Sequence, residues 1–209
     1  MYMTRVQLRR APAPDVIHRV LSGVFPGKRS DNKNENLWRI DSLGDSKALI
    51  VVSADVPDLD YLIVSVGRGP AGAACTDEFG AQDKTIDYDP FLDKVMDGQN
   101  WNFRLCANPV EHKKQNPDDK RGKVFALRTI SEQIKWLYSQ GDKNGYTVIG
   151  CSVIGDSWIV FDKVRIRSVT FDGLLSVTDA EAFRNALSHG IGRGKAYGCG
   201  LLTVAKVQV

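Results

Sequence analysis

Residues 178–207 read TDAEAFRNALSHGIGRGKAYGCGLLTVAKV and predict a helix, a glycine-rich turn and a strand in direct succession. Thr178 and Glu181 have the spacing of a capping box, which opens a helix by satisfying its first free N–H groups. The apolar stripe of that helix has helical spacing and comprises Phe183, Ala186 and Leu187. Apolar residues return from Leu201 to Val207. The stretch therefore predicts the last helix and the last strand of a mixed α and β domain.

The residues before this stretch predict more strands around a second capped helix. Thr129 and Glu132 form another capping box, and Gly141 is expected to end the helix that they open. Its apolar face is expected to contain Ile130, Ile134 and Leu137. We expect strands over residues 146–154, 158–169 and 171–177, and a hairpin that pairs residues 102–107 with residues 123–128.

The N-terminal half repeats the same order of elements. Alternation predicts a strand over residues 2–8, and an apolar stripe predicts a helix over residues 14–24. Two more strands are expected over residues 37–42 and 47–54, and short strands and loops over residues 56–100. Each half thus reads approximately as βαββαβ. We predict an α+β fold of two tandem ferredoxin-like (RRM-like) domains, residues 1–95 and 96–209.

Composition excludes few functions. The chain has 209 residues, of which 43% are hydrophobic, and a formal net charge of +3, so a nucleic-acid partner must be argued from local clusters of charge. The four cysteines are scattered and form no CxxC pair, which argues against a metal site. No segment approaches the roughly 18 apolar residues of a membrane span. We expect a cytoplasmic protein with reduced thiols and no membrane partner.

The glycine-rich turn fits neither common nucleotide-binding template. A P-loop requires Ser or Thr after GxxxxGK, but Ala196 follows Gly194-Lys195. A dinucleotide loop requires GxGxxG after a strand, but here the glycines follow a helix and the third glycine is missing. We therefore expect no nucleotide cofactor, and a nucleotide-dependent enzyme is disfavoured.

The turn instead resembles the C-terminal glycine-rich loop of the RAMP superfamily, in particular of the CasE-type endoribonucleases of type I-E CRISPR systems. The pattern G-(I/V)-G-x-x-K-x-x-G-x-G-L-L is matched at Gly190, Ile191, Gly192, Lys195, Gly198, Gly200, Leu201 and Leu202. FRLCANP at residues 103–109 resembles the F-R-L-R-A-N-P strand of this branch, and QIKWL at residues 133–137 resembles its helical segment. The motifs keep the order of the family.

The resemblance implies a metal-independent endoribonuclease without a cofactor. Such an enzyme binds the stem-loop of CRISPR repeat RNA and cuts at the base of the hairpin by attack of the 2′-hydroxyl. The products are a 2′,3′-cyclic phosphate and a 5′-hydroxyl, and the mature guide RNA is expected to stay with other Cascade-type subunits. Asp15 stands where some members carry tyrosine. A non-catalytic subunit that binds repeat RNA is therefore the alternative.

His18 lies where the family carries its catalytic histidine. A lone histidine on a helix is more often structural, but Asp15 and Ser22, at i−3 and i+4, share its polar face beside the apolar stripe. Histidine is suited to general acid or base work near neutral pH. With the resemblance, we predict that His18 and Ser22 are catalytic.

Basic clusters predict where RNA would bind. We expect phosphate contacts from the histidine helix and the loop after it, the basic run at residues 112–128, one strand face and the glycine-rich turn. In that order they are Arg19, Lys28, Arg29; Lys113, Lys114, Lys120, Arg121, Lys123, Arg128; Lys163, Arg165, Arg167; and Gly192, Arg193, Gly194, Lys195. The alternatives are a solvated hairpin tip, an exposed sheet face and a packing seam. Trp101, Trp136 and Trp158 are expected in the core, and Trp38 is undecided.

Overall fold

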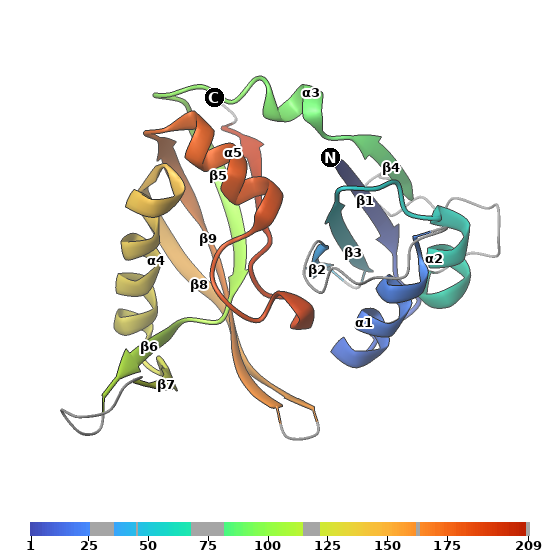
Figure 1. The fold of residues 1–209 in the computed structure, drawn as a ribbon, viewed down its shortest axis with the longest axis horizontal. Helices are drawn as coiled ribbons and strands as arrows, with labels where there is room; N and C mark the ends of the chain where they lie inside the picture. The colour runs from blue at the N-terminus through green and yellow to red at the C-terminus, as the bar shows by residue number, and fades with distance from the viewer. Residues whose placement is uncertain (26–35, 45, 68–81, 115–121, 162–163, 208–209) are drawn as a thin grey trace.

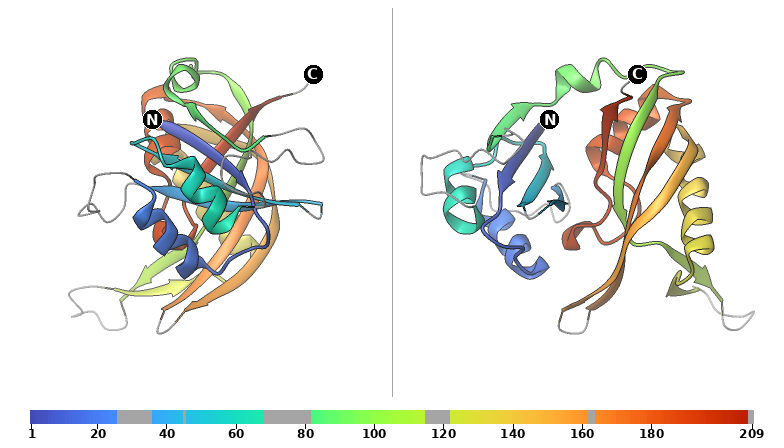
Figure 2. Two further views of the ribbon diagram at one scale, coloured as in Figure 1. Left: turned by 90° about the vertical axis from the view of Figure 1, so that its right-hand side faces the viewer. Right: turned by 180° about the vertical axis from the view of Figure 1, so that it is seen from behind.

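Two four-stranded antiparallel sheets, each with helices on its outer side, make up the protein (Figures 1 and 2). The computed structural model describes residues 1–25, 36–44, 46–67, 82–114, 122–161 and 164–207. Within these ranges, no helix is both long and apolar enough to span a membrane.

The N-terminal half has the element order βαββαβ. It comprises β1 (Tyr2–Gln7), α1 (Pro14–Gly23), β2 (Leu37–Leu43), β3 (Ser46–Ser53), α2 (Leu59–Val66) and β4 (Lys84–Asp87). The strands lie in the order β2-β3-β1-β4. Because side chains alternate along a strand, β3 serves two cores. Leu49 and Val51 pack with Ile17 and Leu21 of α1, whereas Val52 packs with residues of the C-terminal half.

The C-terminal half has the same topology with a hairpin added. A short helix, α3 (Asp89–Leu92), leads into it. Its elements are β5 (Asn100–Ala107), β6 (Val110–Lys113), β7 (Lys123–Ala126), α4 (Ile130–Asn144), β8 (Tyr146–Phe161), β9 (Val164–Val177), α5 (Ala180–His189), the 3₁₀ turn η1 (Lys195–Tyr197) and β10 (Leu202–Lys206). Its sheet order, β10-β5-β9-β8, repeats that of the first sheet. The predicted α+β fold of tandem ferredoxin-like domains is confirmed.

Three predictions about strands and helices were wrong. Residues 123–126 pair with β6 and not with β5, because β9 and β10 already occupy both edges of β5. Residues 146–161 and 164–177 form two long strands instead of three shorter ones, with bulges in β8 near Val148 and Val153. Residues 59–66 form α2, capped by the Asp58 side chain, where we expected strands and loops.

The start of α4 was predicted correctly, its buried face only in part, at Leu137, and its end was not. The Thr129–Glu132 capping box is present. The helix continues past Gly141 to Gly145, which has a φ of 69°. Gly141 is buried within the helix. A side chain does not fit there, because a Cβ would lie 2.3 Å from the carbonyl oxygen of Tyr146. The buried face of α4 is formed by Gln133, Leu137 and Gly141, whereas Ile130 is 59% exposed.

The predicted cap of α5 was wrong by one residue. The Asp179 carboxylate accepts a hydrogen bond from the Ala182 N–H at 3.0 Å, so Asp179 is the N-cap in place of Thr178. The Thr178 N–H instead donates to the carbonyl of Gly145. This bond joins the start of α5 to the end of α4.

Candidate nucleic-acid interface

The glycine-rich loop between α5 and β10 depends on backbone conformations that favour glycine. All five of its glycines have φ between 75° and 96°. Gly198 is also crowded, because a Cβ there would lie 2.8 Å from the ring of Trp38 on β2. Gly192 lies against Trp136 and Gly194 against Cys199. The loop therefore packs between the two halves of the protein, and Trp38, which was undecided, belongs to the core at 4% exposure.

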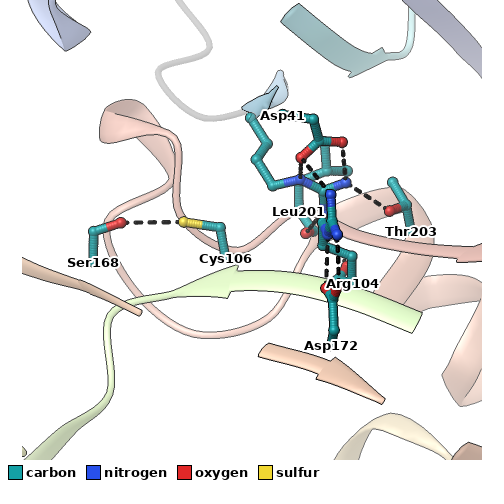
Figure 3. Close-up of polar contacts among 8 residues, drawn as sticks. Asp41, Arg104, Cys106, Ser168, Asp172, Leu201 and Thr203 are labelled. Carbon is teal, nitrogen blue, oxygen red and sulfur yellow. Dashed lines mark hydrogen bonds and ion pairs between the residues drawn. The ribbon is translucent and has the colours of Figure 1, made fainter. Parts of the chain in front are cut away.

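The end of β5 holds this loop in place, so two of the sequence motifs meet in space. The Gly200 N–H donates to the Cys106 carbonyl at 2.6 Å. The backbone of Arg193 pairs with that of Asn108 in a single antiparallel β-bridge. The Cys106 thiol lies 3.2 Å from the Ser168 hydroxyl (Figure 3). Its hydrogen bond with Cys199 lowers the pKa of Cys106 and raises that of Cys199. Both thiols are buried, so they are part of the packing under the loop.

The two cations of the loop have different surroundings. Lys195 is half-buried, and its ammonium donates to the carbonyl of His189, the last residue of α5. Removal from water lowers the pKa of Lys195. A cation at this position satisfies a free carbonyl and complements the helix dipole. Arg193 is exposed. Of the two, Arg193 is therefore the cation better placed to meet an RNA phosphate.

The helix that carries His18 lies beside this loop. α1 contacts η1, although the two are at opposite ends of the sequence (Figure 1). His18 is exposed on α1, and among the described residues its imidazole makes no hydrogen bond or ion pair. The Ser22 hydroxyl donates to the backbone carbonyl of His18 at 2.8 Å, and Arg19 lies 3.7 Å from Asp15. The polar face of α1 is thus formed as predicted, but Ser22 bonds to the backbone and Asp15 pairs with Arg19, so neither contacts the His18 imidazole.

The β6–β7 hairpin projects from the body and carries exposed cations (Figure 1). Lys113 and Lys123 are cross-strand partners, and like charges in that position repel each other. Glu111 pairs with Lys113 at 2.5 Å. Lys114 and Arg128 are also exposed. The exposed cations of this hairpin are therefore in a position to bind an external anion. The predicted contacts Lys28, Arg29, Lys120, Arg121 and Lys163 lie outside the described residues.

The outer part of β8 and β9 forms a basic arm around Trp158. The Arg165 guanidinium lies 4.3 Å from the centre of the Trp158 ring, and that of Arg167 lies 5.1 Å from it. Asp156 pairs with Arg167 and also accepts from Gln133 of α4. Trp158 is only half-buried and belongs to neither core cluster, so its prediction as a core residue was wrong. Trp101 is buried, and Trp136 packs against the core as predicted.

A buried ionic network joins the two halves, and sequence reasoning missed it. Arg39 of β2, 4% exposed, pairs with Asp41 through two hydrogen bonds of 2.6 and 2.8 Å (Figure 3). It also donates to the carbonyls of Arg104 and Leu201, each at 3.0 Å. Arg104 in turn pairs with Asp172 of β9. A buried charge requires such partners. The network therefore fixes β2 against β5 and the end of the glycine-rich loop.

The residues described above include a candidate proton-transfer group, His18, and several exposed cations. No three His, Cys, Asp or Glu side chains come close enough to hold a metal ion in the part of the chain that the structure describes. A site of this composition can bind a polyanion and move a proton at His18.

Two known proteins and one solved structure resemble this chain over nearly its whole length. The CRISPR-associated endoribonuclease Cse3 of Thermus thermophilus is 25% identical, covering 97% of this chain and 94% of the relative. The CRISPR system Cascade subunit CasE of Escherichia coli K12 is also 25% identical, covering 98% and 99%. A solved structure of the CRISPR endoribonuclease Cse3 bound to 19 nt RNA has a TM-score of 0.75 at 24% identity, covering 98% of each chain, and this likeness supports the fold.

A family model described as CRISPR associated protein matches residues 1–206. The match spans both sheets and includes α1, the β6–β7 hairpin and the glycine-rich loop. The chain therefore belongs to the family of CRISPR associated proteins, and its predicted resemblance to the CasE type is confirmed.

Proposed function

We propose that this protein is an endoribonuclease that binds the hairpin of CRISPR repeat RNA and cuts at its base. The observation that carries the proposal is the meeting of the His18 helix with the glycine-rich loop, since proton-transfer and phosphate-binding groups then share one surface. The names of the relatives, an endoribonuclease and a Cascade subunit, support the same activity.

The chemistry that we propose is transesterification followed by release of the product. A base removes the proton of the 2′-hydroxyl, its oxygen attacks the adjacent phosphorus, and the bond to the 5′-oxygen breaks as that oxygen gains a proton. The products are a 2′,3′-cyclic phosphate and a 5′-hydroxyl. His18 is our candidate for one of these proton transfers. The Ser22 hydroxyl already donates within α1, so a catalytic role for it requires that bond to open.

Binding is proposed to depend on shape and charge. The major groove of an RNA stem is too narrow for side chains to read, so phosphate contacts dominate recognition of a duplex. The exposed cations of the β6–β7 hairpin form a projecting strip that suits such contacts. We include the other predicted cations in the proposal, among them those outside the described residues.

Cleavage in the presence of EDTA tests the reaction that we propose. Repeat RNA incubated with the protein and EDTA is expected to be cut at one site to a cyclic phosphate end. Loss of cutting in EDTA with recovery in magnesium would replace the acid–base mechanism with a metal-dependent one. Tight binding without cutting under both conditions would favour the alternative, a non-catalytic RNA-binding subunit. That alternative is supported by the position of His18, whose imidazole has no hydrogen-bond partner among the described residues.

We further propose that the protein assembles with other Cascade-type subunits in the cytoplasm, which the name of the CasE relative supports. We also propose residues 1–95 and 96–209 as the two domains. The strands of the first sheet end at Asp87 and those of the second begin at Asn100, which supports a boundary in the connecting segment.

A further inference from the structure

A cavity of about 670 Å³ separates the β6–β7 hairpin from the β8–β9 arm. Its walls include Lys113, Phe125 and Arg128 from the hairpin and the segment after it, and Trp158 and Arg165 from the arm. This volume lies within the range of small-molecule sites, roughly 300–1,000 Å³, and would hold a nucleotide. Because the hairpin is the proposed RNA-binding element, a ligand in this cavity would lie directly beside bound RNA.

Aromatic side chains on both walls remain accessible to solvent. Phe125 is 39% exposed on β7, and Trp158 is half-buried on β8. Exposed aromatic rings beside cations are a common platform for nucleic-acid bases, because every base presents a flat face for stacking. In a duplex those faces are covered by neighbouring base pairs. The platform therefore suits an unpaired nucleotide better than the stem.

The two arginines near the Trp158 ring differ in how firmly they are held. Arg167 is fixed by the Asp156 carboxylate, which Gln133 of α4 also holds. Arg165 contacts the Trp158 ring, and within the described ranges no carboxylate pairs with it. A guanidinium held only by a ring face can move to a phosphate and uncover the ring.

The acidic side chains of the cavity are already engaged. Glu111 pairs with Lys113, and the Glu132 carboxylate accepts from the N–H groups of Arg128 and Thr129 at the start of α4. The Arg128 guanidinium has no ion-pair partner in the described part of the chain. Among the described residues, Arg165 and Arg128 are therefore the cavity cations that no carboxylate pairs with.

We propose that this cavity binds one unpaired nucleotide of the RNA, with its base stacked on Trp158 and a neighbouring phosphate bound by Arg165 and Arg128. The inference rests on the proposed function, since it assumes that RNA lies along the hairpin. The unpaired nucleotide comes either from the terminal loop of the RNA hairpin or from a flanking single strand. The site gives the protein a means to distinguish an RNA by a base outside the stem.

Abasic substitution tests the stacking contact and identifies its source. The probe is the stem-loop of the host's CRISPR repeat with both flanking strands, in which each unpaired base is removed in turn. Affinity is measured in the His18→Ala background, so that cleavage does not interfere. One abasic position, in the loop or in a flank, is expected to weaken binding by about 5- to 100-fold.

Variants at Trp158 then show whether that base contacts the ring. Trp158→Leu is expected to lose a similar factor with intact RNA and little with the RNA that lacks the critical base, whereas Trp158→Phe retains most of the affinity. Tyr138→Leu, which removes an exposed aromatic ring on α4 outside this cavity, is the matched control and is expected to bind like the parent protein.

Two results would overturn the inference. One is that no abasic position weakens binding. The other is that Trp158→Leu weakens binding to every abasic RNA by the same factor, which would mean that the base and the ring act independently. Melting temperatures identify a loss that arises from unfolding. If the wild-type protein cuts the RNA but the effect of Trp158→Leu does not depend on any one base, this inference fails and the proposed nuclease activity stands. If that dependence appears but the protein does not cut, the proposed nuclease activity fails and this inference stands.

Discussion

At the scale of single residues, Gly198 shows how the glycine-rich loop depends on both conformation and space. Gly198 has a φ of 83°, and a Cβ would lie 2.8 Å from the Trp38 ring. Gly98 has nearly the same φ, 78°, but nothing lies within 4 Å of the position of its Cβ. The two glycines therefore separate the cost of backbone strain from the cost of a steric clash.

Replacing each of these glycines with alanine tests the packing of the loop. Gly198→Ala is expected to lower the free energy of unfolding by about 1–3 kcal/mol more than Gly98→Ala, the usual cost of overpacking. Chemical denaturation of both variants measures the difference. Equal losses would mean that the Trp38 contact adds nothing and that only the positive φ requires glycine.

The sequence indicated individual site residues well where the cause was local. The glycines after α5 predicted a turn, and all five have positive φ. Arg39 was missed because an arginine on an alternating strand usually faces solvent. Its burial arises from contacts with Arg104 and Leu201, which are distant in the sequence. Trp158 was misplaced for the opposite reason, since a tryptophan on a strand usually enters a core.

At the scale of elements, local signals fixed the start of α4 better than its end. The Thr129–Glu132 capping box was read directly from the sequence and is present. Gly141 looked like the end of α4, yet its role is to let the backbone of Tyr146 approach. Similarly, the partner of β7 could not be read from the sequence, because it depends on which edges of β5 other strands occupy.

The β6–β7 hairpin is the element in which charge is expected to matter most. Replacing Lys113, Lys114 and Lys123 with alanine should weaken binding of hairpin RNA and flatten its salt dependence. Each lost phosphate contact is expected to remove about one unit from the slope of log K against log salt concentration. Fluorescence anisotropy at several salt concentrations measures this slope.

A control for this hairpin variant removes charge elsewhere. Lys94 and Lys143 are also exposed, but they lie on the connecting segment and at the far end of α4. Their replacement with alanine is expected to leave the slope nearly unchanged. If the hairpin variant kept the wild-type slope, the hairpin would be only a solvated tip.

At the scale of the whole molecule, the network around Arg39 is expected to hold the two halves in register. Arg39→Ala would leave Asp41 without its bidentate partner and would remove the guanidinium donors to two carbonyls. Breaking a buried ion pair from one side costs about 3–5 kcal/mol. We expect a loss of that size in the free energy of unfolding, whereas exposed Arg10→Ala should change it by less than about 0.5 kcal/mol. A loss similar to that of Arg10→Ala would remove the network from the account.

The overall topology was predictable because each half repeats the order βαββαβ. What the sequence could not place was the site, because α1 and η1 come together only through the packing of one half on the other. The resemblance of three motifs to the CasE type pointed to His18 and to the glycine-rich turn, but it did not place them side by side. The physical reading of the residues alone left His18 more typical of a structural histidine.

The most direct test of the account is single-turnover cleavage of cognate repeat RNA by the wild-type protein, His18→Ala and His112→Ala, side by side in EDTA. His112 is an exposed histidine on the β6–β7 hairpin and serves as the matched control. We expect His18→Ala to slow cleavage by roughly 10²–10⁴-fold, the usual effect of losing a general acid or base, with nearly unchanged RNA affinity. His112→Ala is expected to cut at close to the wild-type rate. A His18→Ala rate within a few-fold of wild type would contradict the central claim that His18 transfers a proton in the reaction.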